Sequence, residues 1–241
     1  MKKLILTTTA LALSAGMAFA GSHSMTVRMG TEGAYPPFNF INDSGEVDGF
    51  ERELGDELCK RAELKCEWVT NDWDSIIPNL VSGNYDTIIA GMSITAERME
   101  KIDFTEAYTQ PDPSAYAVLS TDVDIKTGVI AAQANTIQAA FVAEAGAQLV
   151  EFATVDEALA AVVNGEADAI LADKASLTDY VAADDALMFL EQEEMIGGGV
   201  GMGIRKSDAE LRGKFDAAIK SMKDDGTLNA LITKWQIGET F

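Results

Sequence analysis

The chain has 241 residues, and 47% of them are hydrophobic, which is enough for one large core or two smaller ones and excludes a disordered protein. Its formal net charge of −21 disfavours nucleic acid and anionic lipid as partners, because both would be repelled. The acid content fits either attraction of cationic solutes or simple solubility, and composition leaves both open.

The N-terminus predicts an export signal over residues 1–20. Lys2 and Lys3 precede an apolar run over residues 4–19, and small residues at its end form a typical cleavage site. A membrane anchor is disfavoured, because Thr, Ser and Gly interrupt a run that is shorter than about 18 apolar residues. We therefore predict an exported protein, whose net charge changes from −21 to −23 when the signal and its two lysines are removed.

The only two cysteines, Cys59 and Cys66, predict a single disulfide, because export implies an oxidising compartment. The bond would close a short loop and stabilise the fold by about 2 kcal/mol. A zinc site is disfavoured, since the only histidine, His23, lies beside the predicted cleavage point. We expect neither a metal nor a cofactor.

The first predicted strand covers residues 25–31, which alternate between apolar and polar side chains. A turn with two prolines follows over residues 32–38. Glu32 and Tyr35 therefore lie just after the carboxyl end of a predicted parallel strand, the edge at which open α/β sheets bind ligands. Apolar spacing then predicts a helix over residues 50–61.

A strand over residues 64–69 and a helix over residues 72–81 come next. Trp73 lies at the start of this helix, after a strand end. A tryptophan in such a position is about equally compatible with core packing and with the wall of a pocket.

Residues 90–98 form the most informative turn of the chain. They follow a buried apolar run, and Thr95 is a suitable N-cap for a helix whose first turn contains Arg98. Open backbone amides and a hydroxyl, Ser93, beside a guanidinium make a good receptor for a carboxylate. The alternative is that Arg98 pairs with one of the many acids of the chain. We predict that this turn binds the carboxylate of a small molecule.

An internal repeat divides the chain. Residues 81–91 recur as residues 163–173 without a gap, and both copies predict a helix end, a glycine cap, an Asp turn and a buried strand. The two strands end at Gly91 and Asp173. If the repeat marks two similar α/β lobes that face each other, these strand ends line one cleft. Chance similarity is the alternative, because the pattern is frequent in α/β proteins.

The second lobe is predicted to begin after a stiff connector. Residues 109–113 contain two prolines and are typical of a boundary between domains. Residues 115–119 then cross over, residues 128–134 form a strand, and a helix begins at Ile137. Open amides near Thr136 and Ile137 would point back at the cleft.

A glycine-rich stretch over residues 197–204 predicts a strand that crosses back between the lobes and must bend. A phosphate-binding loop is disfavoured, because no Lys-Ser/Thr pair opens a helix there. Ser207 with Glu210 then predicts the cap of the next helix, and a turn over residues 225–227 leads into a final one.

These stretches together resemble a known family, the extracellular solute-binding proteins of polar amino-acid ABC importers, and most of all its lysine/arginine/ornithine- and histidine-binding type. The resemblance covers nearly the whole mature chain. It rests on the spacing of the two cysteines and on these motifs: Gly30-Thr31-Glu32, Tyr35-Pro36-Pro37-Phe38, Gly49-Phe50-Glu51-Arg52-Glu53-Leu54, Trp73-Asp74-Ser75-Ile76-Ile77-Pro78, Met92-Ser93-Ile94-Thr95-Ala96-Glu97-Arg98 and Asp225-Gly226-Thr227.

The resemblance implies an α/β protein with the two-lobed type II fold of periplasmic binding proteins. Lobe 1 would comprise residues 25–110 and 204–241, and lobe 2 residues 111–203, with crossover strands near 109–115 and 198–204. Such proteins close around one amino acid and deliver it to a membrane-embedded ABC permease. We therefore expect that partner, no nucleic acid, and a monomer.

The resemblance also implies a ligand site of twelve residues: Glu32, Tyr35, Trp73, Ala90, Gly91, Ser93, Arg98, Gln133, Thr136, Ile137, Gln138 and Asp173. Arg98 would bind the α-carboxylate, helped by Ser93 and by the first amides of the helix that begins at Ile137. Asp173 would bind the α-ammonium together with the carbonyl of Gly91.

The same resemblance places Tyr35 and Trp73 on either side of the ligand side chain. The tip of that side chain would meet Glu32, Gln133 and Gln138. A carboxylate there favours a cationic tip, because a charged hydrogen bond contributes about 1.5–3 kcal/mol. We expect a basic amino acid, lysine first, then arginine, ornithine and histidine; glutamine, another polar amino acid or an opine is the alternative. For Glu32 the alternative is an exposed acid on an acidic surface.

Three departures from the family pattern concern the pocket. Glu32 stands where the basic-amino-acid binders usually have Asp, so its carboxylate reaches one methylene farther. Asn135 occupies a usual glycine position, and Ile137 a common threonine position. Residues 121–128 form a short segment, which predicts a trimmed helix in lobe 2.

An enzyme on the same fold, such as a dehydratase, is the main competing class. It would need a general acid or base beside a reacting bond, whereas the acids of the cleft already have binding roles and no Ser/His or Cys/His set exists. A membrane-linked sensor would need a transmembrane segment. We therefore predict a binding protein without catalytic residues.

Overall fold

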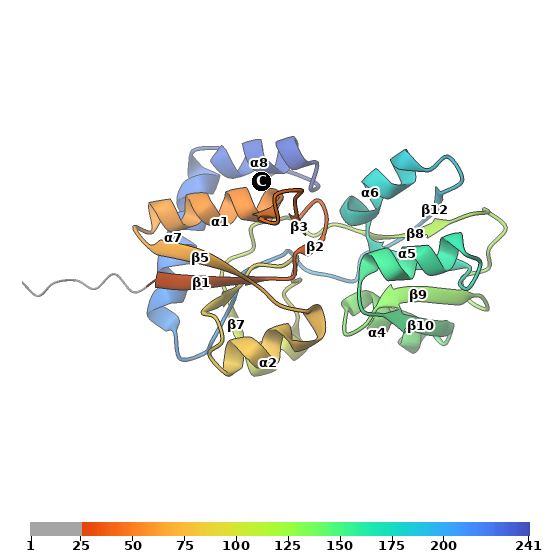
Figure 1. Cartoon of the computed structure of the whole chain (residues 1–241), viewed down its shortest axis with the longest axis horizontal. Coiled ribbons are helices and arrows are strands. Elements are labelled where there is room, and N and C mark those ends of the chain that lie inside the picture. Colours follow the sequence, from red (N-terminus) through yellow and green to blue (C-terminus); the bar gives the residue numbers. More distant parts are fainter. Residues whose placement is uncertain (1–25) are drawn as a thin grey trace, which may run out of the picture.

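The computed structural model describes residues 26–241. The predicted export signal, residues 1–20, and His23 lie outside the described residues. Figure 1 shows two lobes side by side, each with a β-sheet and helices, joined by extended segments near the middle. This is the predicted two-lobed α/β fold. Among the described residues, no helix has both the length and the apolar character needed to cross a membrane.

Lobe 1 is built on a sheet with the strand order β5-β1-β6-β13-β7. Its strands are β1 (Thr26–Thr31), β5 (Lys65–Thr70), β6 (Thr87–Ile88), β7 (Asp103–Phe104) and β13 (Gly203–Ile204). β1 is parallel to β5 and β6, whereas β13 is antiparallel to β6 and β7. A small antiparallel sheet extends this lobe and contains β2 (Ala34–Tyr35), β3 (Asn39–Ile41) and β4 (Val47–Asp48).

Five α-helices belong to lobe 1: α1 (Phe50–Arg61), α2 (Ile76–Val81), α3 (Ala96–Lys101), α7 (Ala209–Asp224) and α8 (Thr227–Trp235). α1, α7 and α8 contact one another on one side of the sheet, and α2 lies on the other side (Figure 1). The predicted helix over residues 72–81 begins as a 3-10 helix, Trp73–Ser75, before α2.

Lobe 2 is built on a second sheet with the order β10-β9-β11-β8-β12. Its strands are β8 (Ser114–Val118), β9 (Val129–Gln133), β10 (Gln148–Phe152), β11 (Ala169–Asp173) and β12 (Met188–Glu194), and its helices are α4 (Ile137–Ala145), α5 (Val155–Val163) and α6 (Lys174–Ala183). β9 is parallel to β10 and β11, and β8 is antiparallel to β11 and β12.

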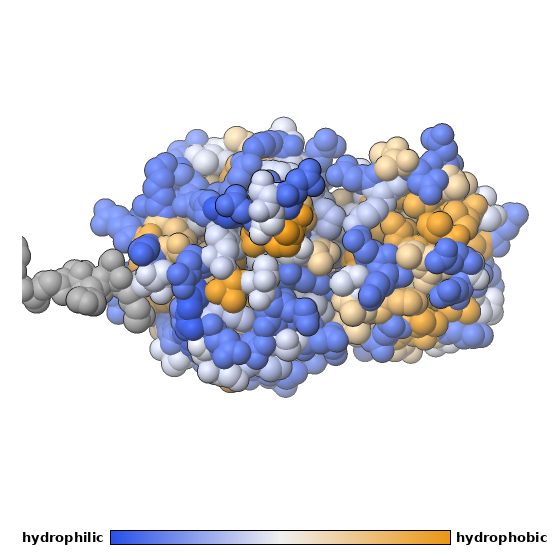
Figure 2. Space-filling model, in the orientation of Figure 1, coloured by the Kyte–Doolittle hydropathy of each residue, from blue (hydrophilic) through white to orange (hydrophobic). Residues whose placement is uncertain are grey.

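The face drawn in Figure 2 is mostly hydrophilic over lobe 1, whereas hydrophobic residues gather over lobe 2. The exact lobe boundaries stay a prediction.

The internal repeat is confirmed as a structural repeat. α2 and α5 are each followed by a glycine in the left-handed region, Gly83 with φ 82° and Gly165 with φ 75°. The aspartates three residues later each accept a hydrogen bond from the neighbouring strand, Asp86 from Arg28 N (3.0 Å) and Asp168 from Val129 N (2.7 Å). The strands that follow, β6 and β11, are buried, which explains their uninterrupted apolar sequence.

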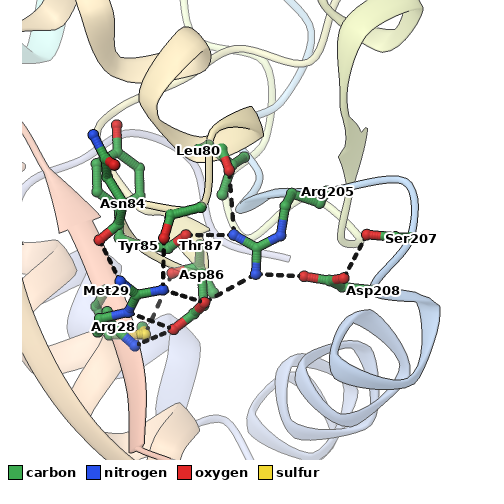
Figure 3. A network of polar contacts seen from close by, with 11 residues as sticks. Arg28, Met29, Leu80, Asn84, Tyr85, Asp86, Thr87, Arg205, Ser207 and Asp208 are labelled. Atoms are coloured by element: carbon green, nitrogen blue, oxygen red, sulfur yellow. Dashed lines mark hydrogen bonds and ion pairs between the residues drawn. The ribbon is translucent and has the colours of Figure 1, made fainter.

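In lobe 1 this turn is part of a charged network (Figure 3). The Asp86 carboxylate binds Arg28 and Arg205, each through an N–O distance of 2.9 Å. Burial alone would raise the pKa of Asp86, but the hydrogen bonds from Arg28 and Arg205 outweigh it and lower the pKa to about 2. Arg205 comes directly after β13, so the network joins the returning C-terminal part of the chain to the first strand of the lobe.

The two segments that connect the lobes, between β7 and β8 and between β12 and β13, are tied to each other. Thr105 N donates to Met202 O (3.0 Å), and Met202 N donates to the Thr105 hydroxyl (3.0 Å). Val200 N likewise donates to the Thr109 hydroxyl (3.0 Å). Threonine side chains therefore replace part of a regular strand ladder.

The glycine-rich strand predicted over residues 197–204 is wrong in extent, because only Gly203–Ile204 form a strand. The physical reason is the close approach of the two connecting segments. A Cβ atom at Gly199 would lie only 2.4 Å from the backbone oxygen of Thr109. Because glycine has no side chain, residues 197–201 can approach the other connecting segment closely, and they do so without forming a continuous strand.

The predicted cap of α7 by Ser207 and Glu210 is also wrong. Asp208 occupies the N-cap position, and its side chain makes no capping hydrogen bond. Its carboxylate instead binds Arg205 (2.6 Å), while the Ser207 hydroxyl donates to the same carboxylate (2.6 Å). The side chains of Ser207 and Asp208 are therefore bound within the charged network and do not cap α7.

The predicted disulfide is confirmed. Cys59 and Cys66 are bonded, with their Cα atoms 6.2 Å apart. The bond joins the end of α1 to the start of β5, and it holds the helix against the edge strand of the lobe 1 sheet.

Candidate functional site

All twelve residues of the predicted ligand site line one cavity between the lobes: Glu32, Tyr35, Trp73, Ala90, Gly91, Ser93, Arg98, Gln133, Thr136, Ile137, Gln138 and Asp173. Lobe 1 supplies the first seven, from the segments that follow β1 and β6, from the short 3-10 helix and from α3. Lobe 2 supplies the rest, from β9, α4 and β11. The cavity has a volume of about 20 Å³, which is room for about one water molecule. It is small because side chains of the two lobes bind one another across it.

Arg98 lies in the first turn of α3, as predicted. The Thr95 hydroxyl caps this helix by accepting from Arg98 N (3.2 Å). The guanidinium donates to Ser93 O (2.9 Å) and lies 5.3 Å from the centre of the Trp73 ring. Within the part of the chain that the structure describes, no carboxylate forms an ion pair with Arg98. Burial lowers the pKa of Arg98, but a guanidinium stays charged at neutral pH.

Asp173 ends β11 and faces lobe 1. Its Oδ2 accepts a hydrogen bond from the Tyr35 hydroxyl (2.6 Å), and its Oδ1 accepts one from Gln138 Nε2 (2.8 Å). Burial raises the pKa of Asp173, although the hydrogen bond from Tyr35 and the charge of Arg98 act in the opposite direction. The Tyr35 contact is one of the bonds that hold the two lobes together.

Glu32 follows β1 and meets Gln133 of lobe 2. Gln133 Nε2 donates to Glu32 Oε1 (2.6 Å) and also to Ala153 O (3.0 Å). Burial raises the pKa of Glu32 to about 7. The carboxylate is therefore a half-buried group of the cleft wall, which excludes the alternative of an exposed surface acid.

Glu32 and Gln133 occupy equivalent positions in the two lobes. β1 pairs with β6 at Met29, and β9 pairs with β11 at Ile130. Each cleft residue lies three positions beyond its paired residue. The repeat therefore brings a carboxylate from one lobe and an amide from the other to the same point of the cleft.

Asn135 lies at the mouth of the cleft, between β9 and α4. Its φ of 59° lies in the left-handed region, which asparagine adopts more readily than most residues. Its Nδ2 donates to Asp74 Oδ1 (3.0 Å), and its backbone oxygen accepts from Trp73 Nε1 (3.4 Å). An asparagine at a usual glycine position is thus accommodated, and it adds a contact between lobes that the sequence did not reveal.

The first turn of α4 faces the cavity, as predicted. The Thr136 hydroxyl caps the helix by accepting from Ala139 N (3.1 Å), whereas the amides of Ile137 and Gln138 have no carbonyl partner within the helix. Gln138 also lines the cavity, and its contact with the tip of a ligand side chain stays a prediction. It contacts Asp173 and the Ser114 hydroxyl (3.0 Å), because the first turn of α4 directs it toward β11 and β8 rather than toward Glu32.

The chain matches a known protein family over most of its length. The model of the bacterial extracellular solute-binding proteins, family 3, matches residues 27–239. The chain belongs to this family. The solute-binding family was the one predicted from the motifs, and its fold was the predicted two-lobed one.

Two similar proteins of the solute-binding family are named for basic amino acids, and one similar crystal structure contains lysine. The L-arginine-binding protein of Pseudomonas aeruginosa is 33% identical, over 98% of this chain and 96% of that protein. The lysine/arginine/ornithine-binding periplasmic protein of Escherichia coli is 31% identical, over 98% of this chain and 97% of that protein. The crystal structure of a periplasmic His/Glu/Gln/Arg/opine family-binding protein from Silicibacter pomeroyi in complex with lysine has 68% identity and a TM-score of 0.85, over 87% of this chain and 96% of that chain.

Proposed function

We propose that this protein is the periplasmic substrate-binding component of an ABC importer and binds a basic amino acid, lysine before arginine, ornithine and histidine. The observation that carries the proposal is the arrangement of charge in the cleft. Arg98 has no acid partner among the described residues, while Asp173 and Glu32 are carboxylates whose present donors are uncharged side chains. The names of similar proteins support the same class of ligand.

An amino acid with a cationic side chain complements these three groups. Its α-carboxylate would bind Arg98 and the amides of α4, and its α-ammonium would bind Asp173. Its terminal cation would bind Glu32 in place of the neutral donor Gln133. The ligand thus replaces hydrogen bonds between a carboxylate and a neutral donor by hydrogen-bonded ion pairs, in which the opposite charges also attract each other.

The bonds across the cleft describe a closed arrangement, and binding requires that they open. Tyr35 and Gln133 hold Asp173 and Glu32 from the opposite lobe, and the cavity of about 20 Å³ is too small for an amino acid. We propose that residues 25–110 with 204–241 move against residues 111–203 about the crossovers near 109–115 and 198–204. The closed form, as a monomer, would then be recognised by a membrane-embedded permease.

A catalytic function is the second candidate, because the pKa of about 7 at Glu32 matches the requirement for general acid–base catalysis near neutral pH. The shift alone does not indicate catalysis, because it follows from burial of Glu32, and a cationic ligand would favour the ionised carboxylate again. The names of the similar proteins, which are binding proteins, favour binding. Incubation with an amino-acid panel and with a prephenate-like acid, followed by NMR of the small molecules, distinguishes the two: turnover would contradict the proposal.

The decisive experiment is a calorimetric titration of protein that has been unfolded and refolded to remove any bound solute. We expect lysine to bind most tightly, followed by arginine, ornithine and histidine, with glutamine and glutamate weaker. Glu32→Gln should reduce lysine affinity by about 10- to 100-fold, which corresponds to a charged hydrogen bond of about 1.5–3 kcal/mol. Glu46→Gln, the same change at an exposed turn, should leave affinity unaltered. Preference for a neutral amino acid would overturn the choice of a basic ligand.

A further inference from the structure

A buried carboxylate outside the ligand cavity stands out on α1. Glu51 is 0% exposed, whereas Glu53 on the same helix reaches the surface and pairs with Lys234. Glu51 Oε1 accepts hydrogen bonds from Gly91 N (2.7 Å) and from the Tyr108 hydroxyl. Burial of a carboxylate is costly unless its oxygens are fully hydrogen-bonded, so this placement needs a reason.

The second oxygen of Glu51 reaches another part of the cleft. Glu51 Oε2 accepts from Asn39 Nδ2 (2.7 Å), and Asn39 Oδ1 in turn accepts from Gly33 N (2.7 Å). Gly33 directly follows Glu32. The carboxylate therefore holds, through one asparagine, the loop that carries the acid proposed to select the ligand.

The first oxygen holds two other parts of the site. Gly91 lines the cavity next to Tyr35: its φ is +61°, and a Cβ there would lie 3.1 Å from the Tyr35 ring. Tyr108 directly precedes Thr109, which binds Val200 in the second connecting segment. One side chain thus joins the ligand turn, the Glu32 loop and a connecting segment.

We propose that Glu51 is a positioning residue of the binding site: its carboxylate fixes the Gly91 turn and the Gly33 loop in the geometry that receives the ligand. This inference rests on the proposed function for its ligand, and on the three hydrogen bonds for its geometry. All three neighbours of the carboxylate are donors. Only a group that accepts on both oxygens satisfies them all, and a carboxylate does so.

The donor pattern makes Glu51→Gln a sharp test, because an amide has one acceptor and one donor. If the amide oxygen faces Gly91, the amide nitrogen meets the donating nitrogen of Asn39. Asn39 can turn over to accept, but it then gives up its bond from Gly33. Every orientation of the introduced amide therefore frees at least one of the two glycine amides.

A second substitution should repair the first. In the double variant Asn39→Asp, Glu51→Gln, the amide introduced on α1 would donate to the new carboxylate, which would still accept from Gly33 N. The oxygen of the same introduced amide would accept from Gly91 and Tyr108. The total charge and the number of hydrogen bonds are then those of the unmodified protein. Asn39→Asp alone would place two carboxylates side by side and should be the least stable of the set.

The experiment combines amide hydrogen exchange by NMR with calorimetric titration of lysine, at a temperature at which circular dichroism shows every tested variant to be folded. Glu51→Gln should accelerate exchange at Gly91 or Gly33 and raise the Kd for lysine, each by about tenfold or more. The double variant should return both quantities to within about threefold of the unmodified protein. Glu53→Gln, the same change on the outer side of α1, should alter neither.

The outcomes separate a positioning role from mere stabilisation. A folded Glu51→Gln variant with unchanged lysine affinity and unchanged exchange would overturn the inference, as would a double variant no better than Glu51→Gln in either quantity. Tyr108→Phe removes only the bond to the connecting segment, so it should lower the melting temperature but change the Kd by less than about threefold. If the unmodified protein binds no basic amino acid, the proposed function fails, and exchange at the two glycines still decides the role of Glu51.

Discussion

The two copies of the repeat have the same backbone turn, but the side chains around the turn differ. In both, a glycine ends a helix and an aspartate binds an amide of the neighbouring strand. In lobe 1, Asp86 also binds two arginines. In lobe 2, Asp168 is exposed and forms no ion pair with any residue that the structure describes. The backbone turn therefore needs only the carboxylate–amide bond, and the arginines serve lobe 1, which is assembled from two separate parts of the chain.

The ends of the repeated strands show the same division between geometry and chemistry. After β6 the chain has Gly91, whose lack of a side chain lets the Tyr35 ring approach closely, whereas β11 ends with the charged Asp173. At the equivalent positions after β1 and in β9 stand Glu32 and Gln133. Two carboxylates there would repel each other across the closed cleft. The repeat determines where side chains meet, and the residue at each end determines what each lobe contributes.

The largest loss of lysine affinity should follow from removing one of the two charged side chains that face each other from the two lobes. Arg98→Ala removes the proposed carboxylate receptor of lobe 1, and Asp173→Ala removes the proposed ammonium receptor of lobe 2. Each should raise the Kd for lysine by more than about 100-fold, because each leaves a ligand charge without a partner. Calorimetry checks both, with Arg212→Ala, a surface ion pair to Asp103, as the control. Binding within about tenfold of the unmodified protein in either variant would contradict the assigned roles.

A second pair of variants compares the two turns directly. Asp86→Ala should lower the free energy of unfolding by about 2–4 kcal/mol, because it leaves Arg28 and Arg205 without their shared carboxylate. Asp168→Ala loses one exposed carboxylate–amide bond and should lower it by about 1 kcal/mol. Urea unfolding followed by circular dichroism measures both. Equal losses in the free energy of unfolding would show that the ion pairs of Asp86 with Arg28 and Arg205 do not stabilise lobe 1.

The pH dependence of binding tests the pairing of Glu32 with Gln133. With the pKa of Glu32 raised to about 7 in the ligand-free protein, the Kd for lysine should rise about tenfold between about pH 8 and pH 6, because the carboxylate must give up its proton to bind a cation. The free energy of unfolding of the ligand-free protein should change in the opposite direction and fall as the pH rises. The stabilisation from protonated Glu32 is fully present below its unfolded pKa of about 4.5 and is lost as the pH rises through about 7. Glu32→Gln should flatten the binding profile, and a profile that keeps its slope would assign the titration to another group.

The contact at the mouth of the cleft should matter least. Asn135→Gly keeps the left-handed backbone but removes the bond to Asp74, so the Kd should rise by only about two- to fivefold for every amino acid alike. Asp74→Ala is the matching change on lobe 1, because it removes the acceptor of the same bond. Titration of lysine, arginine and histidine with each variant checks this, and a changed order of preference would mean that Asn135 selects the ligand.

Much of the fold could be predicted because local patterns determine it. The helix over residues 50–61, the Thr95 and Thr136 caps and the two glycine turns depend on neighbours in sequence. The lining of the cavity followed from the repeat and from the family resemblance. The features that escaped prediction depend on distant contacts and ion pairs: Asp208, for example, is drawn away from its helix by Arg205.

Glu51 shows the same limit at the site. It lies on the buried side of α1, next to Phe50 and one turn from Leu54, where an acid is unusual. That position in an apolar stripe was a signal available in the sequence. Its partners, however, come from three other parts of the chain, so its role could not be read from spacing.

The tie between the connecting segments restricts how the lobes can move. Thr105 and Met202 bind each other in both directions, and Thr109 binds Val200. Two independent tethers would allow the lobes to slide, twist and separate. Two segments that are hydrogen-bonded side by side resist sliding past each other, and they deform most easily by bending together as one unit. The proposed opening of the cleft would then be close to a rotation about a single axis, and the two faces of the cleft would return to the same register each time it closes.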